Sequence, residues 1–453
     1  MMGDFRFAAA RRASLVPAIA AVVLLATAGA AGAQGIVPPR APQGLFGGIL
    51  PDAGARVRLD VSASIVEGYD DDVPAEVQPV VDRSSLQSGG FSTFLTGAAA
   101  FAYRGSRAEV AANASSTVRY YGELGETRSV GHSAGVGVDA RLSDRATLLL
   151  NQSVSYSPTY FYDLFPIGGV VEPGDAGTTT SDFTVSDRES TTYRTTASLR
   201  HEFSTRDRLT LGGEYEYTDR LSESDVWSDI SGYTFRGGFS RDLARNTTLS
   251  TSGRYHSGHH GYIREGLTTE LGADVGLEFR KPLSATRQTA VRFSVGLTGL
   301  DLPESRTAVP GDRRQYRTVG DVSYAFQFGR TWEARAGARR GVEYLADLPE
   351  PVFADSVSAG VDGLLSRRVD VAASAGYSNG ESVLNRGGER FDTYSATAQL
   401  RVALGRSVAT YVQYLYYYYD FRGTTQLLAG IPAALERQGV RVGLTVWAPA
   451  LRR

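Results

Sequence analysis

The feature that most constrains the fold of this chain is a long, regular alternation of apolar and polar residues. In the run RVRLDVSASI at residues 56–65, apolar side chains from Val57 to Ile65 alternate with polar side chains from Arg56 to Ser64. Successive side chains of a β-strand point to opposite sides of the sheet, so a period of two predicts strands. The run is also longer than a typical strand of a soluble protein, which has about 5–6 residues.

The same alternation recurs over much of the chain. Similar runs occupy residues 107–121, 193–203, 267–280, 289–298 and 440–446, and we count about eighteen in all. The connections between the runs alternate in length. Tight turns fall at residues 105–106, 143–144, 205–207, 244–245, 283–285, 329–330, 367–368 and 405–406. Longer acidic or glycine-rich connections lie near residues 70–88, 157–190, 219–231, 257–266, 301–314, 345–351, 380–390 and 420–436, with a short one near 122–127.

The alternation and the loop rhythm together predict an all-β fold, a closed antiparallel transmembrane β-barrel of about 18 strands (16–18). Tight turns at one end, long loops at the other and an even strand number are typical of outer-membrane barrels. Lipid forces the sheet to close, because an open edge would leave unpaired backbone groups in hydrocarbon. A soluble secreted β protein would also alternate, but the strand length, the loop rhythm and the aromatic placement disfavour it.

Aromatic residues gather at both ends of the runs, where the two interfaces of a membrane favour them. The predicted belt at the loop ends consists of Tyr120, Tyr156, Tyr217, Tyr255, Tyr414 and Tyr416 to Tyr419. The predicted belt near the tight turns consists of Phe101, Tyr103, Phe203, Phe279, Phe326, Phe328 and Trp332.

Residues 1–33 are predicted to be a cleaved secretory signal peptide. A basic stretch at residues 6–12 precedes an apolar, small-residue stretch that ends in Ala-Gly-Ala, which predicts cleavage between Ala33 and Gln34. Residues 34–54 are rich in proline and glycine and form either a periplasmic tail or a plug. The barrel is expected over residues 55–449, followed by a C-terminal tail at 450–453.

Composition removes several classes of function. The chain carries 47 Lys+Arg against 49 Asp+Glu, a net charge of −2 that argues against a nucleic-acid partner. Cysteine is absent, which removes disulfide frameworks, cysteine-zinc sites and thiol nucleophiles. No motif calls for a cofactor, and we expect none.

The end of the first run carries a family resemblance. The stretch from Glu67 to Val73 reads Glu-Gly-Tyr-Asp-Asp-Asp-Val, and it resembles the opening of the β-barrel porin type 2 family of proteobacterial envelopes. Asp72 stands where that family's pattern has asparagine. The strand rhythm resembles the family over most of the chain, which implies an outer-membrane barrel, sometimes connected with polysaccharide export, and brings no catalytic residues. Such barrels usually end on an aromatic residue, a place that Trp447 fills before residues 448–453.

Three motifs invite chemistry, and for each we favour a structural interpretation. Residues 131–135 match G-x-S-x-G, but the alternation continues after them without a helix, and His132 and Ser133 would face opposite sides of a strand. We therefore do not expect an enzyme. His256, His259 and His260 lie around one loop without a fixed third ligand, so no metal site is expected. The acidic residues 70–72 end a strand and would bind a cation weakly at most.

Charged residues on the polar face of the runs are the most informative set. So many charges cannot lie in a dry core, so we expect a water-filled lumen. Our candidates for lumen-lining residues are Arg194, Arg200, Arg236, Arg254, Arg292, Arg335, Glu202, Glu214, Glu270, Asp274 and Asp321. For any one of them, pairing across strands to stabilise the wall is the simpler role. The largest predicted loop, Ser157 to Ser190, is the candidate for an infolded constriction.

The sequence therefore predicts a porin-like channel in the outer membrane of a Gram-negative bacterium, which lets small hydrophilic solutes diffuse passively. The alternative is an outer-membrane barrel that assists polysaccharide export or surface structure without general porin activity. Expected partners are outer-membrane lipid and lipopolysaccharide, the barrel-insertion machinery and the solutes. Assembly into a homo-oligomer stays open.

Overall fold

The structure is a computed structural model of the chain. It describes residues 56–71, 89–121, 127–157, 189–221, 229–259, 267–284, 286–302, 314–329, 331–344, 351–383, 390–420 and 434–453. The predicted signal peptide, its cleavage site and the tail or plug at 34–54 lie outside these ranges. No helix in the described part is long and apolar enough to cross a membrane.

The described residues form eighteen β-strands. They are β1 (Val57–Asp70), β2 (Gly90–Arg104), β3 (Ala108–Tyr121), β4 (Thr127–Ser143), β5 (Ala146–Ser157), β6 (Glu189–Glu202), β7 (Asp207–Leu221), β8 (Ile230–Ala244), β9 (Thr247–His259), β10 (Thr268–Ser284), β11 (Arg287–Asp301), β12 (Arg314–Phe328), β13 (Trp332–Glu343), β14 (Val352–Ser366), β15 (Val369–Ser382), β16 (Arg390–Ala403), β17 (Val408–Asp420) and β18 (Ala434–Arg452).

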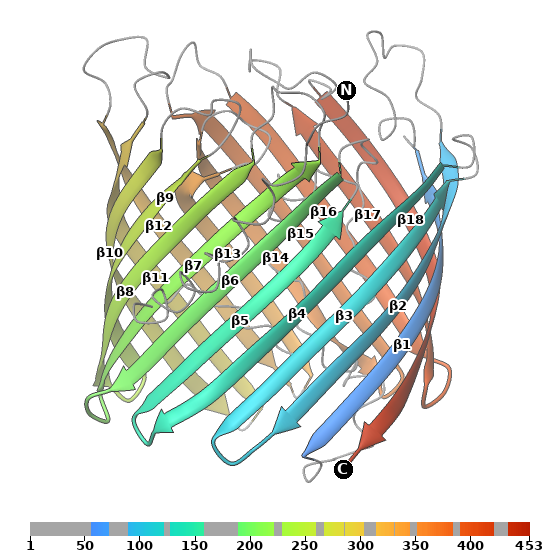
Figure 1. Cartoon of the computed structure of the whole chain (residues 1–453), viewed down its shortest axis with the longest axis horizontal. Helices are drawn as coiled ribbons and strands as arrows, with labels where there is room; N and C mark the ends of the chain where they lie inside the picture. Colours follow the sequence, from blue (N-terminus) through green and yellow to red (C-terminus); the bar gives the residue numbers. More distant parts are fainter. Residues whose placement is uncertain are drawn as a thin grey trace, which may run out of the picture.

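The strands close into one antiparallel barrel (Figure 1). Each strand pairs with its neighbours in sequence, and β1 pairs with both β2 and β18. The β1–β18 ladder runs from Arg58 opposite Arg452 to Asp70 opposite Gly439, so the first and last strands leave no free edge along it. The predicted fold class, a closed all-β antiparallel barrel of about 18 strands, is confirmed.

The two ends of the barrel differ. The connections after the even-numbered strands are tight turns at the lower end of Figure 1, where the C-terminus also lies. Four of these turns use serine in the same way. The hydroxyl oxygens of Ser143, Ser204, Ser284 and Ser366 each accept the backbone N–H two residues later, at 3.2, 3.1, 3.3 and 3.2 Å. This local bond replaces a ladder bond at the point where the chain reverses.

The alternation in sequence becomes a difference between the two faces of the wall. Residues opposite one another in a ladder share a face, so the face of one strand fixes the face of the next. On the outer face, large apolar side chains are open to the surroundings, for example Ile65 at 46%, Leu95 at 50% and Leu297 at 63% exposure. The inner face carries polar and charged side chains, described below.

One part of the predicted aromatic belt is wrong. Tyr417 and Tyr419 are 4% and 1% exposed and stand opposite Ser395 and Thr393 on the inner face. Their neighbours Tyr416 and Tyr418 point to the outer face instead. Alternation forces successive side chains to opposite sides, so four tyrosines in a row cannot all join one belt.

The predicted C-terminal tail at 450–453 is also wrong, because β18 continues to Arg452. A bulge makes this extension fit: Asp60 pairs with Pro449, whereas Leu59 pairs with Leu451. The extra residue, Ala450, shifts the alternation by one, so Leu451 joins the outer face beside Leu59. Trp447 stands opposite Ser62 on the inner face and is 7% exposed, so it does not face the lipid side.

The wall changes at the upper end between β12 and β13. The β11–β12 ladder extends to Arg314, but the β12–β13 ladder starts only at Gly320 opposite Arg340. Residues 341–343 of β13 pair with β14 alone. We call residues 341–344 and 351–354 the β13–β14 tip.

Candidate functional site

All eleven predicted lumen residues share the inner face of the barrel. Arg194 stands opposite Glu216, Arg236 opposite Arg254, and Asp321 opposite Ser294 in the ladders. The same chain of pairings places the others, which are Arg200, Arg292, Arg335, Glu202, Glu214, Glu270 and Asp274. The sequence pattern alone sufficed to assign this face, since period two admits only two sides.

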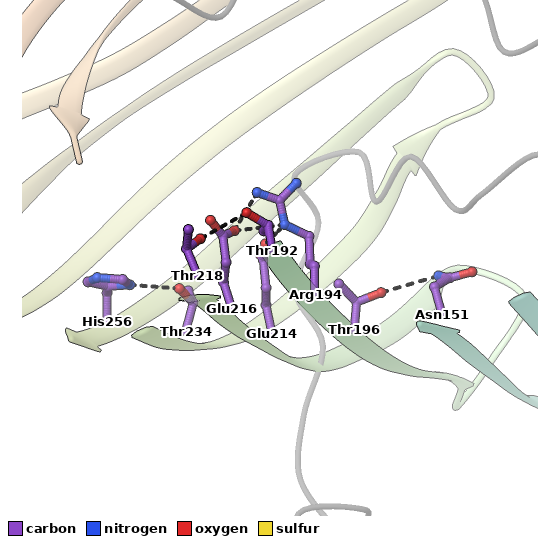
Figure 2. A network of polar contacts seen from close by, with 9 residues as sticks. All are labelled: Asn151, Thr192, Arg194, Thr196, Glu214, Glu216, Thr218, Thr234 and His256. Atoms are coloured by element: carbon purple, nitrogen blue, oxygen red, sulfur yellow. Dashed lines mark hydrogen bonds and ion pairs between the residues drawn. The ribbon is translucent and has the colours of Figure 1, made fainter. Parts of the chain in front are cut away.

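A polar network covers the inner face of β5 to β9 (Figure 2). Arg194 lies between two carboxylates: its Nε is 3.3 Å from Glu214 Oε1, and its Nε donates to Glu216 Oε2 at 2.8 Å. Hydroxyl pairs continue the network, with Thr192 and Thr218 joined at 3.0 Å. Arg194 remains 53% exposed at its side chain, so the pair faces open space rather than a packed core.

Most of the other predicted charges are compensated within the wall. Glu278 accepts from Arg280 at 2.7 Å and from Arg292 at 3.0 Å. Arg335 bridges two carboxylates, Glu333 at 2.9 Å and Asp362 at 2.7 Å.

Four predicted residues have other surroundings. Asp274 accepts a hydrogen bond from Ser252. Asp321 interacts electrostatically with Arg292 and Arg339. Arg200 and Glu202 lie near a tight turn, where Glu202 stands opposite Arg208 in the ladder.

Arg236 differs from these pairs. Its electrostatic neighbours are Arg254 and Arg339 of the same sign, together with Glu214 and Glu270. No ion pair of Arg236 within 4 Å occurs among the described residues. Its positive charge is therefore less compensated than that of Arg194 or Arg335.

The β13–β14 tip crosses the inner face and narrows the upper end of the barrel. Tyr344, which follows β13, donates to Glu270 Oε2 of β10 at 3.1 Å. Its ring also lies 4.3 Å from that of His256 of β9. Strands β9 and β13 are not neighbours in the sheet, so these contacts pass through the interior.

Glu270 is the anchor of this contact and is 3% exposed. It accepts from Thr298 at 2.9 Å and lies 3.5 Å from Arg254 Nη2, in addition to its bond with Tyr344. Burial and the adjacent Glu270 carboxylate raise the pKa of Tyr344, which keeps the phenol protonated as a donor. A buried carboxylate with three such partners is a stable attachment point.

Apolar packing holds the same tip. Val342 and Phe353 belong to the outer face by alternation, yet they pack against Leu300, Leu302 and Val383 and are at most 3% exposed. Leu300 stands opposite Glu270 and hence on the inner face of β11. The outer face of the tip therefore rests on the inner face of the neighbouring wall.

Sequence reasoning missed this constriction. The predicted one, Ser157 to Ser190, lies almost wholly outside the described residues. Val342 and Phe353 fit the alternation of ordinary lipid-facing positions, so no local signal marks them. The end of the β12–β13 ladder, which frees the tip to turn inward, depends on long-range pairing.

The three motifs that invite chemistry have structural surroundings. Ser133 bonds Ser115 at 2.7 Å on the inner face, while His132 packs on Tyr156 at 6.0 Å on the outer face, within the continuous strand β4. His256 bonds Thr234 at 2.8 Å, and His260 lies outside the described residues.

The acidic residues and the remaining histidines provide no metal centre in the described part of the chain. Asp70 pairs with Arg437 at 2.6 Å, Asp71 accepts the Gln438 backbone N–H at 2.8 Å, and Asp72 lies outside the described ranges. Among the described residues, no group of three histidines or acids could hold a metal ion.

The fold and this two-faced wall define the chain as a wide closed barrel with a polar interior. No protein-family model and no curated protein matches the sequence. Solved structures similar to it include OpdL of Pseudomonas aeruginosa, with 11% identity and a TM-score of 0.44, covering 87% of this chain and 99% of that one. OccK2 (OpdF) of the same organism, solved in complex with glucuronate, has 8% identity and a TM-score of 0.47, covering 87% and 98%. OccAB1 of Acinetobacter baumannii has 10% identity and a TM-score of 0.46, covering 88% and 100%.

Proposed function

We propose that this protein is a porin-like channel of the outer membrane of a Gram-negative bacterium, through which small hydrophilic solutes diffuse passively. One observation carries the proposal. In a closed ring of eighteen strands, the outer face exposes apolar side chains, and the inner face carries polar and charged side chains. Hydrocarbon outside and water inside is the arrangement that satisfies both faces.

The width of the ring supports a water-filled path. Small barrels of about eight strands fill their interior with side chains, whereas barrels of about 16–18 strands leave an aqueous channel. Arg194 and Arg292 keep half or more of their side chains exposed although they face inward. Charges of this kind set the field that a passing solute meets.

The solute path narrows at the β13–β14 tip. A solute would pass between the tip, held at Tyr344 and Glu270, and the charged wall that carries Arg194 and Glu216. We propose the eleven inner-face residues predicted from the sequence as lining of this path.

The remaining assignments are proposals of the same kind. We retain the β-barrel porin type 2 family on the strength of residues 67–73. Outer-membrane lipid and lipopolysaccharide would surround the apolar face, and the insertion machinery would receive β18 with Leu451 as its last outer-face apolar residue.

Single-channel recording in planar bilayers tests the channel. The full mature chain, folded in detergent and checked by a heat-modifiability gel, should give steady ohmic current steps. A correctly folded barrel that stays silent would overturn the proposal and favour the role in polysaccharide export or surface structure.

A further inference from the structure

The upper edge of β12 beside β13, which has no ladder partner among the described residues, is a feature that passive diffusion does not use. From Arg314 to Val319, β12 pairs with β11 on one side, and β13 contributes no ladder partner on the other. Among the described residues, no other backbone hydrogen bond covers this edge. We call this unpaired edge, residues 314–319 of β12 beside β13, the β12–β13 seam.

We infer that the seam reaches lipid depth. Tyr316 stands on the outer face of β12 beside the seam and is 70% exposed, as expected for a ring in the interfacial belt. Gly320, where the ladder with β13 begins, lies deeper along β12 than Tyr316. Unpaired backbone groups in hydrocarbon cost several kcal/mol each, so a seam at this depth is retained at a cost to stability.

An apolar side chain closes the seam. Phe353 of β14 is 3% exposed, and the guanidinium carbons of Arg317 and Arg340 lie 6.0 and 4.9 Å from its ring centre. Arg317 belongs to the inner face of β12, whereas Arg340 belongs to the outer face of β13. Phe353 therefore contacts one arginine from each side of the wall.

The surroundings of Phe353 are apolar on the inside and basic at both margins. The packed cluster of Leu300, Leu302, Val342 and Val383 continues from Phe353 into the interior. Arg340 pairs with Asp355 at 3.3 Å, but both side chains are more than half exposed. Such an exposed ion pair contributes little to stability, so Arg340 can bind another anion instead of Asp355.

Arg317 also has spare binding capacity. Its Nε is buried without a hydrogen-bond partner, and its Nη2 makes one long bond of 3.4 Å to Gln315. No ion pair of Arg317 occurs among the described residues. A guanidinium with free donors beside an aromatic ring suits a sulfate, phosphate or carboxylate group.

We propose that the β12–β13 seam is a lateral portal, through which a single-chain anionic amphiphile passes between the outer leaflet and the lumen. The headgroup moves from Arg340 to Arg317, and the chain follows the apolar cluster once Phe353 turns aside. This activity goes beyond diffusion of hydrophilic solutes, which requires no opening in the wall.

A fluorescent alkyl sulfate tests the portal, because its fixed charge prevents it from crossing lipid unaided. The full mature chain is reconstituted into vesicles, and transfer from the outer leaflet to albumin trapped inside is followed. The wild-type protein should speed transfer above that of protein-free vesicles. Phe353→Ala should raise the rate about tenfold, the factor that corresponds to about 1.4 kcal/mol.

Closing the seam with a disulfide gives the opposite test. Positions 318 and 342 would face each other if the ladder continued upward from Gly320 and Arg340. The chain contains no cysteine, so the pair Thr318→Cys and Val342→Cys introduces the only thiols. Oxidation should reduce transfer to the level of protein-free vesicles, and reduction should restore it.

Matched controls separate the portal from general damage. Val322→Cys with Ala338→Cys joins positions that already face each other in the ladder, and oxidation there should leave transfer unchanged. Phe94→Ala removes another buried phenylalanine, on β2, and should also have no effect. Ion conductance of each preparation, measured in parallel, monitors the proposed channel separately.

Three results would overturn the portal. The first is a transfer rate that changes neither in Phe353→Ala nor on oxidation of the disulfide between positions 318 and 342. The second is equal transfer of an alkyl trimethylammonium probe, since the two arginines repel a cation. The third is a barrel that conducts ions but transfers no alkyl sulfate, which would leave the channel function intact.

Discussion

At the scale of the residue, one phenol supplies the polar attachment of the constriction, beside the apolar packing of the tip. Tyr344 connects the β13–β14 tip to the wall at β9 and β10 through Glu270 and His256. Glu270 keeps Thr298 and Arg254 as partners if that phenol is lost, so the wall itself should survive. Loss of the Tyr344 hydroxyl should therefore weaken the attachment of the tip and not the wall.

Tyr344→Phe should therefore weaken the tip and leave the barrel folded. One net hydrogen bond is worth about 1 kcal/mol, so we expect a small fall in stability and a larger rise in current fluctuation. Single-channel noise at fixed voltage measures it. Tyr316→Phe, a change on the exposed outer face, is the control. Equal noise in both variants would contradict this role of Tyr344.

Glycine matters at the residue scale where a large side chain lies across it. A Cβ on Gly443 would collide with the ring of Tyr411, which is 4% exposed on the inner face. Gly443→Val should destabilise the barrel by about 1–3 kcal/mol, the usual cost of overpacking. At Gly97 a Cβ meets nothing within 4 Å, so Gly97→Val should be tolerated. Urea unfolding in vesicles compares the two, and equal losses would refute the packing argument.

At the scale of the element, alternation carries most of the information. It predicted the strands, their faces and the tight turns. In every strand, lipid outside favours apolar side chains and water inside favours polar ones, so the two kinds alternate. Alternation does not predict features that depend on contacts between several strands. Phe353 fits a lipid-facing pattern, yet the tip places it inside against Leu300. Leu451 lies on the outer face because of a one-residue bulge, which no local sequence pattern predicts.

The same limit applies to the candidate site. Arg194 and Glu214 were predictable, because a charge in a strand of this kind must face water. His256 and Tyr344 were not, because their meeting requires β13 to turn across the interior to β9. Sequence pattern thus assigns the wall, whereas long-range pairing decides what narrows it.

The two faces of one strand should respond oppositely to a new charge. Leu297 lies on the outer face of β11 and is 63% exposed, whereas Ser294 lies on the inner face opposite Asp321. Leu297→Arg places a charge against hydrocarbon, a penalty that reaches about 2–4 kcal/mol at the middle of a bilayer and falls toward the interface, and it should lower stability. Ser294→Arg gains a nearby carboxylate and should cost little. Folding into vesicles followed by urea titration distinguishes them, and equal losses would contradict the assignment of faces.

At the scale of the whole molecule, the interior is close to electrical balance. Pairs such as Arg194 with Glu216 and Arg335 with Asp362 cancel over short distances. A solute in the lumen therefore encounters alternating positive and negative charges rather than one strong region of a single sign. The wild-type channel should discriminate weakly between potassium and chloride.

Arg236 is the position where this balance can be shifted with least damage. It makes no ion pair among the described residues, and Arg254 and Arg339 add to its positive field. Arg236→Gln removes one charge without leaving a carboxylate stranded, and it relieves repulsion between the arginines. The reversal potential in a potassium chloride gradient should therefore move toward the value for potassium.

Salt provides the decisive control for that shift. At about 0.01 M the Debye length is about 30 Å, and at about 1 M it is about 3 Å, so the shift should be large in dilute salt and nearly absent in concentrated salt. Arg241→Gln removes an outer-face arginine near a tight turn and should leave the reversal potential unchanged. If Arg236→Gln behaves like Arg241→Gln in dilute salt, then ions do not pass the wall that carries Arg236, and the solute path must run elsewhere.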